Sequence, residues 1–467
     1  MKLIVWGTGN LYRKYKEILS QFELTKLCDN SLDKIGGFLD GVEIIAPSQL
    51  KKYDFDYIVV MTYATEEVCH QIESLEISAD KVILYSQLWC LKEGDICVHC
   101  GNKTMGFDNW IIQNPNSILL ISHNFSYTGV PVAIKNMANV LRRMGYSVLI
   151  AAMEGGTFER ELLFEMIDYI DDLELGYQTE YFKNMLQQFI AIVVGTFDLY
   201  RIAETILCIK TPTIWWVHET YEMYYMGKEK VPQRVGLKFF AGGNRVKKIF
   251  TAHYRECDMQ KLQYCIPDFN RKIFPRKKDV RMVVSVIGTV IERKAQDILL
   301  EALVRMPEDY RNKLKVIFVG KIDESDDIFV KRIMQQKSHM DNLEWILEMT
   351  QERLDEFYSH IDVLVCPSRD DPMPIVVTQA MMHEKICIVS ENVGQAEFIE
   401  QQKNGFVFPN ENAEILKEIL IWLLENRDQC AAIGKASRKI YEEEFSEKVM
   451  EKNLNRILSE LFFMRDT

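Results

Sequence analysis

The sequence lacks the features that would place the chain in a membrane or on nucleic acid. No apolar run reaches the ~18–20 residues that a membrane-spanning helix needs. The opening MKLIVWGTGN does not show the basic segment, apolar segment and small-residue cleavage site of a signal peptide. The net charge is −12, whereas nucleic-acid phosphates require a basic face. We therefore expect a cytoplasmic protein whose partners do not include nucleic acid.

A second pair of metal-binding cysteines is also missing. The 11 cysteines are scattered, which suits a reducing compartment. The tightest group is Cys97, His99 and Cys100, with Cys90 nearby. A structural zinc site needs a further ligand pair at matching spacing, and none is visible. We interpret this group as thiols in a linker and predict no metal site.

What is present is ordinary globular composition arranged in a repeated pattern. The chain has 467 residues, 48% hydrophobic and 27% charged, enough for about three domains. Apolar strand, glycine turn and amphipathic helix follow one another from residues 3, 118 and 282. Short continuous apolar strands separated by helices indicate parallel sheets covered on both faces. The fold class is therefore α/β, with three Rossmann-like doubly wound units.

Composition changes and glycine or proline residues suggest where these units end. The chain is expected to divide into a module at 1–90, a linker at 91–116, a first lobe at 117–275, a second lobe at 280–445 and a helix at 446–467 that crosses back to the first lobe. The connection between the two lobes is expected within 266–280.

The stretch from Cys366 to Met382 carries the most chemical information. It follows an apolar strand, so it lies at the carboxyl end of a parallel sheet, where α/β folds bind ligands. Pro372 and Pro374 are tolerated only before a helix or in its first turn, so Asp371 lies in the loop just ahead of a helix start, and Gln379 lies about one turn inside that helix. The two polar groups could therefore hold two parts of one elongated ligand, with an anion at the helix N-terminus between them.

This stretch resembles the sugar-nucleotide signature of the retaining glycosyltransferases of family 4, which have a two-lobed GT-B fold. In that family two glutamates eight residues apart hold the donor sugar and the nucleotide ribose. Asp371 and Gln379 stand at those two places. Aspartate keeps the charge but is shorter, and glutamine keeps the hydrogen-bonding capacity but loses the charge. The resemblance implies a donor site that includes Asp371, Met373, Pro374 and Gln379, with a catalytic role for Asp371.

A second resemblance lies at the start of the second lobe, where the family clamps the donor diphosphate with basic side chains. Gly288 ends a strand, and Lys294 matches the family lysine. Thr289 replaces a common arginine, so Arg293 is expected to supply the other cation. The resemblance implies that Lys294 is catalytic, because it stabilises the departing diphosphate. Further pocket-lining positions are expected at Gly320, Gly394 and Glu397.

The first lobe resembles the family at two places. The loop from Ser122 to Pro131 matches the loop that faces the cleft, and its Gly129 would allow close backbone approach. His218 follows a buried strand and is implied to point at the donor sugar as a third catalytic residue. Between Lys228 and Lys248 there are seven basic residues against one acid. That range has two interpretations: contact with a membrane surface or lipid-diphosphate acceptor, or a solvated helical face.

The N-terminal module has a dinucleotide-type fingerprint with one departure. Gly7 and Gly9 follow a strand and open a helix, Asp29 ends the next strand, and Tyr12 replaces the usual third glycine or alanine. The module resembles Rossmann-like sugar-nucleotide-binding modules attached to surface-polysaccharide enzymes. We expect Gly7, Gly9 and Asp29 to form its nucleotide-type loop.

Taken together, the resemblance implies a hexosyltransferase-type enzyme that retains anomeric configuration. Its donor would be a UDP-, GDP- or similar diphospho-sugar, without a required cofactor. Its acceptor would be a glycan, lipid-linked or protein hydroxyl, in surface polysaccharide or glycoconjugate synthesis, in the cytoplasm or at the inner membrane face. Two alternatives stay open: a catalytically silent partner of an active transferase, since both glutamates are replaced, and a nicotinamide-dependent activity of the N-terminal module.

Overall fold

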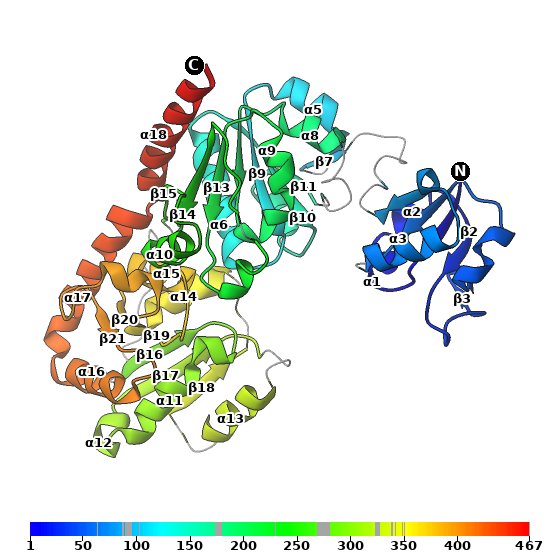
Figure 1. The fold of residues 1–467 in the computed structure, drawn as a ribbon. Coiled ribbons are helices and arrows are strands. Elements are labelled where there is room, and N and C mark those ends of the chain that lie inside the picture. The colour runs from blue at the N-terminus through cyan, green and yellow to red at the C-terminus, as the bar shows by residue number, and fades with distance from the viewer. Residues whose placement is uncertain are drawn as a thin grey trace.

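The computed structural model describes most of the chain. The described residues are 1–62, 64–85, 88, 96–101, 103–171, 173, 180–228, 230–268, 281–322, 327–337, 340, 342–347, 349 and 351–466. Their strands form three separate sheets, each with helices packed against it (Figure 1). The predicted α/β class with three doubly wound units is confirmed. Cys90 lies outside the described residues, as does most of the expected 266–280 connection.

The N-terminal sheet has the order β3-β4-β2-β1-β5-β6 and is parallel except for the β3–β4 pair. Because β2 lies on one side of β1 and β5 on the other, the chain reverses direction across the sheet at β1 and β5. The strands are β1 (Lys2–Trp6), β2 (Glu23–Cys28), β3 (Phe38–Leu39), β4 (Val42–Ile45), β5 (Tyr57–Val60) and β6 (Val82–Leu84). The helices are α1 (Asn10–Lys14), α2 (Lys16–Leu19) and α3 (Thr65–Ser74).

The first lobe is built on a sheet of order β15-β14-β13-β12-β9-β10-β11-β7-β8. Its central strands are mostly apolar and buried along most of their length because helices cover both faces. The parallel strands are β9 (Ser117–Asn124), β10 (Ser147–Glu154), β11 (Asp168–Ile170), β12 (Ala191–Val194), β13 (Thr213–Val217), β14 (Leu237–Ala241) and β15 (Met259–Lys261). The helices include α6 (Gly129–Arg143), α7 (Glu159–Phe164), α8 (Glu180–Leu186), α9 (Ala203–Leu207) and α10 (Asn244–His253).

Residues 96–101 and 103–113 are not a linker, so that prediction is wrong for the described part of 91–116. β7 (Cys97–Cys100) and β8 (Lys103–Gly106) form a hairpin, and β7 pairs antiparallel with β11. The hairpin turns at Gly101, which has a φ of +59°. The helix α5 (Phe107–Gln113) follows, and its Phe107 and Trp110 side chains are buried. The segment is ordered because these aromatic side chains complete the core of the first lobe.

The second lobe has a parallel sheet of order β18-β17-β16-β19-β20-β21. Its strands are β16 (Met282–Ile287), β17 (Leu314–Val319), β18 (Leu343–Ile346), β19 (Val363–Cys366), β20 (Ile386–Ser390) and β21 (Phe406–Phe408). Its helices include α11 (Gln296–Arg305), α12 (Glu308–Arg311), α13 (Asp327–Lys337), α14 (Gln351–His360), α15 (Ile375–Met382), α16 (Ala413–Glu425) and α17 (Arg427–Ile440). The order places the carboxyl ends of β16 and β19 next to each other.

The last helix, α18 (Glu447–Asp466), runs from the second lobe along the first lobe (Figure 1). Lys238 of β14 donates to Glu460 at 2.8 Å, and Arg143 of α6 pairs with Glu447 at 2.8 Å. Buried Leu454, Ile457 and Leu461 share a hydrophobic core with first-lobe residues. This helix therefore ties the end of the chain to the first lobe.

Candidate functional site

The loop between β19 and α15 brings an acidic side chain into the interior of the second lobe. Asp371 is 6% exposed and lies four residues before the first residue of α15, Ile375. Pro374 has an extended backbone just before this helix, so the proline sits where its missing N–H costs nothing. Gln379 is the fifth residue of α15 and is 5% exposed.

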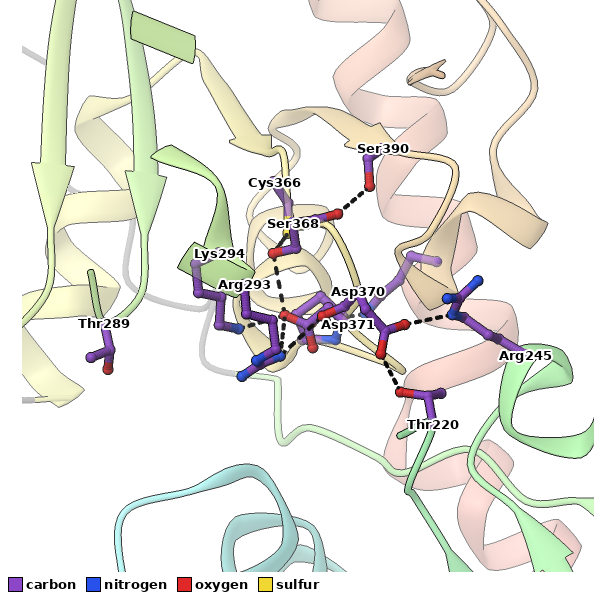
Figure 2. Close-up of polar contacts among 12 residues, drawn as sticks. Thr220, Arg245, Thr289, Arg293, Lys294, Cys366, Ser368, Asp370, Asp371 and Ser390 are labelled. Atoms are coloured by element: carbon purple, nitrogen blue, oxygen red, sulfur yellow. Dashed lines mark hydrogen bonds and ion pairs between the residues drawn. The ribbon is translucent and has the colours of Figure 1, made fainter. Parts of the chain in front are cut away.

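Two cations from a different loop meet Asp371 (Figure 2). The Nζ of Lys294 lies 2.5 Å from Oδ2 of Asp371, and Nη1 of Arg293 lies 3.7 Å from the same oxygen. Arg293 also donates to the backbone carbonyl of Asp370 at 3.1 Å. The predicted grouping of Asp371, Arg293 and Lys294 is therefore present in space. Thr289 is exposed and lies apart from this cluster in Figure 2.

Glycines let two backbone turns approach beside these cations. Gly288 directly follows β16 and has a φ of +149°, and Gly320 directly follows β17 and has a φ of +156°. A Cβ on Gly320 would lie 2.0 Å from the carbonyl oxygen of Gly288, closer than any side chain tolerates. Gly394 is equally constrained, since its Cβ would lie 1.8 Å from the carbonyl oxygen of Pro372. These glycines hold the loops of the site close together.

The remaining predicted residues of the second lobe have defined neighbours. Tyr358 of α14 donates to Oε1 of Gln379 at 3.2 Å. The carbonyl oxygen of Pro374 accepts from Gln395 at 2.8 Å. Met373 reaches across to the first lobe, where its Cε would lie 2.5 Å from a Cβ on Gly243. Gln379 therefore has its side-chain oxygen fixed by a buried tyrosine.

His218 follows β13 in the first lobe and has a strongly perturbed pKa. Burial, with a smaller contribution from His123, lowers the pKa of His218 to about 3, so its ring is neutral at pH 7. Burial also lowers the pKa of His123 near the end of β9. Nε2 of His218 and Nδ1 of His123 are buried without a hydrogen-bond partner among the described residues. Such orphaned nitrogens are a sign of a site that a ligand completes.

His123 is absent from the predicted site residues. The available signal was its position near the carboxyl end of a buried strand, which it shares with His218. Gly129 begins α6, as expected for this loop, but a Cβ there would meet nothing within 4 Å. No atom of the described residues therefore requires a glycine at that position.

The loop that carries His218 is anchored by a buried carboxylate. Glu219 accepts from the backbone N–H of Phe197 at 3.1 Å and from that of His218 at 2.9 Å, and also from the hydroxyl of Thr196. Burial raises the pKa of Glu219. Its hydrogen bonds fix the loop at the end of β13.

Polar contacts between the lobes were not predicted from the sequence. Asp370 accepts from Thr220 Oγ1 at 2.6 Å and from Arg245 Nε at 2.7 Å, both in the first lobe (Figure 2). Glu397 accepts from the backbone N–H of Asn244 at 3.1 Å and pairs with Lys261 at 3.2 Å. These partners lie 125 or more residues apart in the chain, so no local pattern reveals them.

Comparison with known proteins gives the two lobes a family. Residues 268–440 match the family described as glycosyl transferases group 1, and residues 114–244 match glycosyl-transferase family 4. The chain belongs to glycosyltransferase family 4. Residues 1–83 match the family described as C2185-like, N-terminal.

Individual relatives agree with this membership. Spore coat protein SA of Bacillus subtilis is 28% identical over 183 residues, which cover 37% of this chain and 48% of that protein. An uncharacterized glycosyltransferase of Methanocaldococcus jannaschii is 25% identical over 162 residues, which cover 35% of this chain and 42% of that protein. The chain thus spans about half the length of the curated relatives it matches.

Solved structures show the same two-lobed fold. Anabaena HepE in complex with UDP and glucose has a TM-score of 0.64 at 15% identity, covering 74% of this chain and all of that one. A glycosyltransferase from Rickettsia africae has a TM-score of 0.63 at 15% identity, covering 75% of this chain and 99% of that one. The predicted GT-B architecture of this family 4 member is confirmed.

The N-terminal domain of this family 4 member has a cavity of about 340 Å³ at the carboxyl ends of β1, β2 and β5. Gly7, Gly9 and Asp29 line it, together with Lys34 and Thr62. It lies where the chain reverses direction between β1 and β5, the place at which doubly wound sheets bind ligands. The predicted loop residues are therefore brought together around one space.

The carboxylate of Asp29 is already occupied. Its Oδ2 accepts from Thr8 N at 3.2 Å, from the Thr8 hydroxyl and from Lys34 Nζ at 3.0 Å, while Oδ1 accepts from Ser31 N at 2.9 Å. Burial alone would raise the pKa of Asp29, but these hydrogen bonds lower it to about 2. An ionised carboxylate has about four acceptor positions, so few remain for a ribose diol.

The basic range 228–248 is not a helical face throughout. It contains β14, whose Phe239, Phe240 and Ala241 are buried. Four of its seven cations bind within the described protein, and these are Lys228, Arg234, Lys238 and Arg245. Lys230, Lys247 and Lys248 are exposed. The interpretation as a solvated helical face is therefore wrong for 237–241.

The described residues also bear on metal and membrane partners. Within the described ranges, no three His, Cys, Asp or Glu side chains gather as they would around a metal ion. His99 instead stacks on Tyr169 and pairs with Asp171 at 3.4 Å. In the same ranges, no helix is both long enough and apolar enough to span a bilayer.

Proposed function

We propose that the protein is a retaining hexosyltransferase that moves a sugar from a nucleotide diphospho-sugar to a hydroxyl acceptor. The observation that carries this proposal is the cluster of Lys294, Arg293 and Asp371 at the carboxyl ends of β16 and β19. A diphosphate leaving group needs cations that are positioned before it departs. The two cations come from one loop and the acid from another, so the protein itself holds them ready.

The chemistry assigned to each residue follows from its environment. Lys294 and Arg293 stabilise the developing charge on the diphosphate, and Asp371 accepts hydrogen bonds from donor sugar hydroxyls. Gln379, whose oxygen is held by Tyr358, offers its amide N–H groups to the nucleotide ribose. His218 is neutral and can exchange a hydrogen bond with the sugar without adding charge.

The donor and acceptor are proposed at the level of chemical class. Structural neighbours were solved with UDP, UDP-glucose, or UDP and glucose, which supports a UDP-sugar or a related GDP-sugar as donor. We propose a glycan, lipid-linked or protein hydroxyl as acceptor, in surface polysaccharide or glycoconjugate synthesis. The reaction needs no added metal or cofactor, because Lys294 and Arg293 neutralise the diphosphate. The work is done in the cytoplasm or at the inner membrane face, with exposed Lys230, Lys247 and Lys248 toward anionic lipid.

The test is a panel of UDP- and GDP-sugars assayed with the full chain for release of nucleoside diphosphate, with and without EDTA. Slow release without acceptor and anomeric retention in the product, read by NMR, are expected. Nucleotide binding without any release across the panel would overturn the enzyme proposal. That result would favour a catalytically silent partner of an active transferase, as the replacement of both glutamates allows.

We also propose that the N-terminal domain binds a small polar ligand in its cavity. A volume of about 340 Å³ lies near the lower end of ligand sites, roughly 300–1,000 Å³, which fits a mononucleotide or sugar better than a dinucleotide. The full chain with Lys34→Ala would be compared with wild type by thermal shift against UDP, UDP-sugars and NAD. NAD binding that depends on Lys34 would favour a nicotinamide-dependent activity instead.

A further inference from the structure

Two consecutive aspartates face different lobes. Asp371 points to Lys294 and Arg293 of its own lobe, whereas Asp370 points to the first lobe (Figure 2). The Asp370 side chain is 15% exposed, so its charge sits in a partly desolvated place where pairing matters more than at a surface. The two neighbours therefore have separable tasks.

The contacts of Asp370 are direct and use both of its oxygens. Oδ2 accepts from Thr220 Oγ1 at 2.6 Å, and Oδ1 accepts from Arg245 Nε at 2.7 Å. Arg245 also donates to Asn392 Oδ1 at 2.9 Å, and Asn392 donates to the carbonyl of Arg369 at 2.9 Å. Arg245 thus holds the Asp370 loop and the loop beside it with one planar side chain.

The first-lobe partners sit on the elements that carry the other half of the site. Thr220 is two residues after His218, in the loop that Glu219 anchors to Phe197. Arg245 is in the first turn of α10, directly after β14 and a pair of glycines. The hydrogen bond from Thr220 therefore connects Asp370 to the loop of His218 at a point only two residues from that histidine.

The second-lobe side of the contact is equally short. Arg293 Nη1 donates to the Asp370 carbonyl at 3.1 Å, and Arg369 N donates to the Arg293 carbonyl at 2.9 Å. Asp371 N donates to the Asn392 carbonyl at 3.2 Å. The loop that presents Asp371 is consequently held from both lobes at once.

We propose that Asp370 is a positioning residue that sets Asp371 and Lys294 against His218 through Thr220 and Arg245. This inference rests on the proposed transfer reaction, since it explains how two half-sites on different lobes are brought to one donor sugar. Near-attack geometry is sensitive to displacements of about 1 Å, so a contact outside the reacting atoms can control turnover. Binding of the nucleotide, which involves the second lobe, does not require the contact.

The first experiment separates turnover from binding. Arg245→Ala and Asp370→Asn are expected to lower kcat by about 10- to 100-fold while the Kd for UDP or the best nucleotide changes less than about threefold. Lys238→Ala is the matched control, because it removes an ion pair of the first lobe that ends on Glu460 of α18 rather than on Asp370. A kcat within twofold of wild type in both variants, or a parallel loss of kcat and nucleotide affinity, would overturn the proposal.

The second experiment reverses the ion pair and reads structure as well as activity. The double variant, Arg245→Asp with Asp370→Arg, should have a kcat at least tenfold higher than that of either single variant. Hydrogen exchange of the peptides covering 218–226 and 366–374 should rise in each single variant and fall again in the double variant. Wild-type protein that turns over no donor would defeat the proposed function, but the exchange data would still decide the positioning role. Unchanged exchange in Arg245→Ala would reject that role.

Discussion

Lys294 and Asp371 form an ion pair 2.5 Å long although 77 residues separate them in the chain. Both side chains are largely buried, at 19% and 8% exposed, so each charge has lost much of its water. Removing one partner from such a pair costs more than the pair contributes, because the other charge is left uncompensated. A donor diphosphate that enters the site can take over Lys294, which frees Asp371 to accept hydroxyl groups.

Lys294→Ala should remove most of the transfer activity. Loss of one preorganised group that stabilises charge typically lowers kcat by about 10²–10³-fold. Lys315→Ala is the control, since Lys315 pairs with Glu344 at 3.0 Å elsewhere in the same lobe. Nucleotide release by the two variants and wild type is the measurement, with circular dichroism to confirm the fold. Normal turnover in Lys294→Ala would place the donor diphosphate elsewhere.

Substitutions of Asp371 test whether its charge or its length matters. Asp371→Asn removes the charge that holds Lys294 and should lower kcat by about 100-fold or more. Asp371→Glu restores the residue typical of family 4 and should keep at least a tenth of wild-type activity. Comparison of kcat and KM for both variants decides between the two. Equal loss in both variants would mean that the short side chain itself is essential.

Gly320→Ala should destabilise the second lobe through backbone contact. The added Cβ would lie 2.0 Å from the Gly288 carbonyl, and the φ of +156° disfavours any side chain. The expected loss in the free energy of unfolding is about 1–3 kcal/mol. Gly129→Ala is the matched control, because its Cβ has open space around it. Chemical denaturation of both variants is the measurement, and equal stability would contradict the close approach.

The sequence predicted the fold and the second-lobe cluster because both depend on local patterns. Continuous apolar strands such as Val363–Cys366 and Met282–Ile287 are recognisable alone, and the loops after them must meet at one sheet edge. The strand β14 was not predicted because Lys238 interrupts its short apolar run and other cations lie close to it in the sequence. The hairpin of β7 and β8 was not predicted because its two strands are short. It is stabilised by packing on the first-lobe core, which a local sequence pattern does not show.

The contacts of Asp370 could not be predicted, for a different reason. Thr220 and Arg245 carry no motif, and each looks like an ordinary surface residue in the sequence. Their meaning depends on how the two lobes are oriented, which is set by packing over the whole interface. His123 is an intermediate case. Its place near the end of a strand was visible in the sequence, but the sequence could not show that its buried Nδ1 has no hydrogen-bond partner among the described residues.

Neutral His218 should make the protein acid-labile. An unfolded histidine titrates near pH 6.5, whereas burial holds the folded pKa of His218 at about 3. Between these values the unfolded chain binds a proton that the folded chain lacks. The free energy of unfolding is therefore highest above pH 6.5 and falls by about 1.4 kcal/mol per pH unit from this group as the pH drops toward 3. His123, whose pKa is also lowered by burial, adds to the fall.

His218→Gln should flatten this dependence, because glutamine keeps hydrogen-bonding capacity without a titrating group. Urea denaturation at pH 7.5, 6.0, 5.0 and 4.5 gives the free energy of unfolding for variant and wild type. His70→Gln is the control, since the His70 side chain is 79% exposed. The gap between wild type and His218→Gln should change steadily as the pH falls from 6.5, whereas His70→Gln should follow wild type. A gap independent of pH would mean that folding does not lower the pKa of His218, and its role as a permanently neutral partner of the sugar would have to be abandoned.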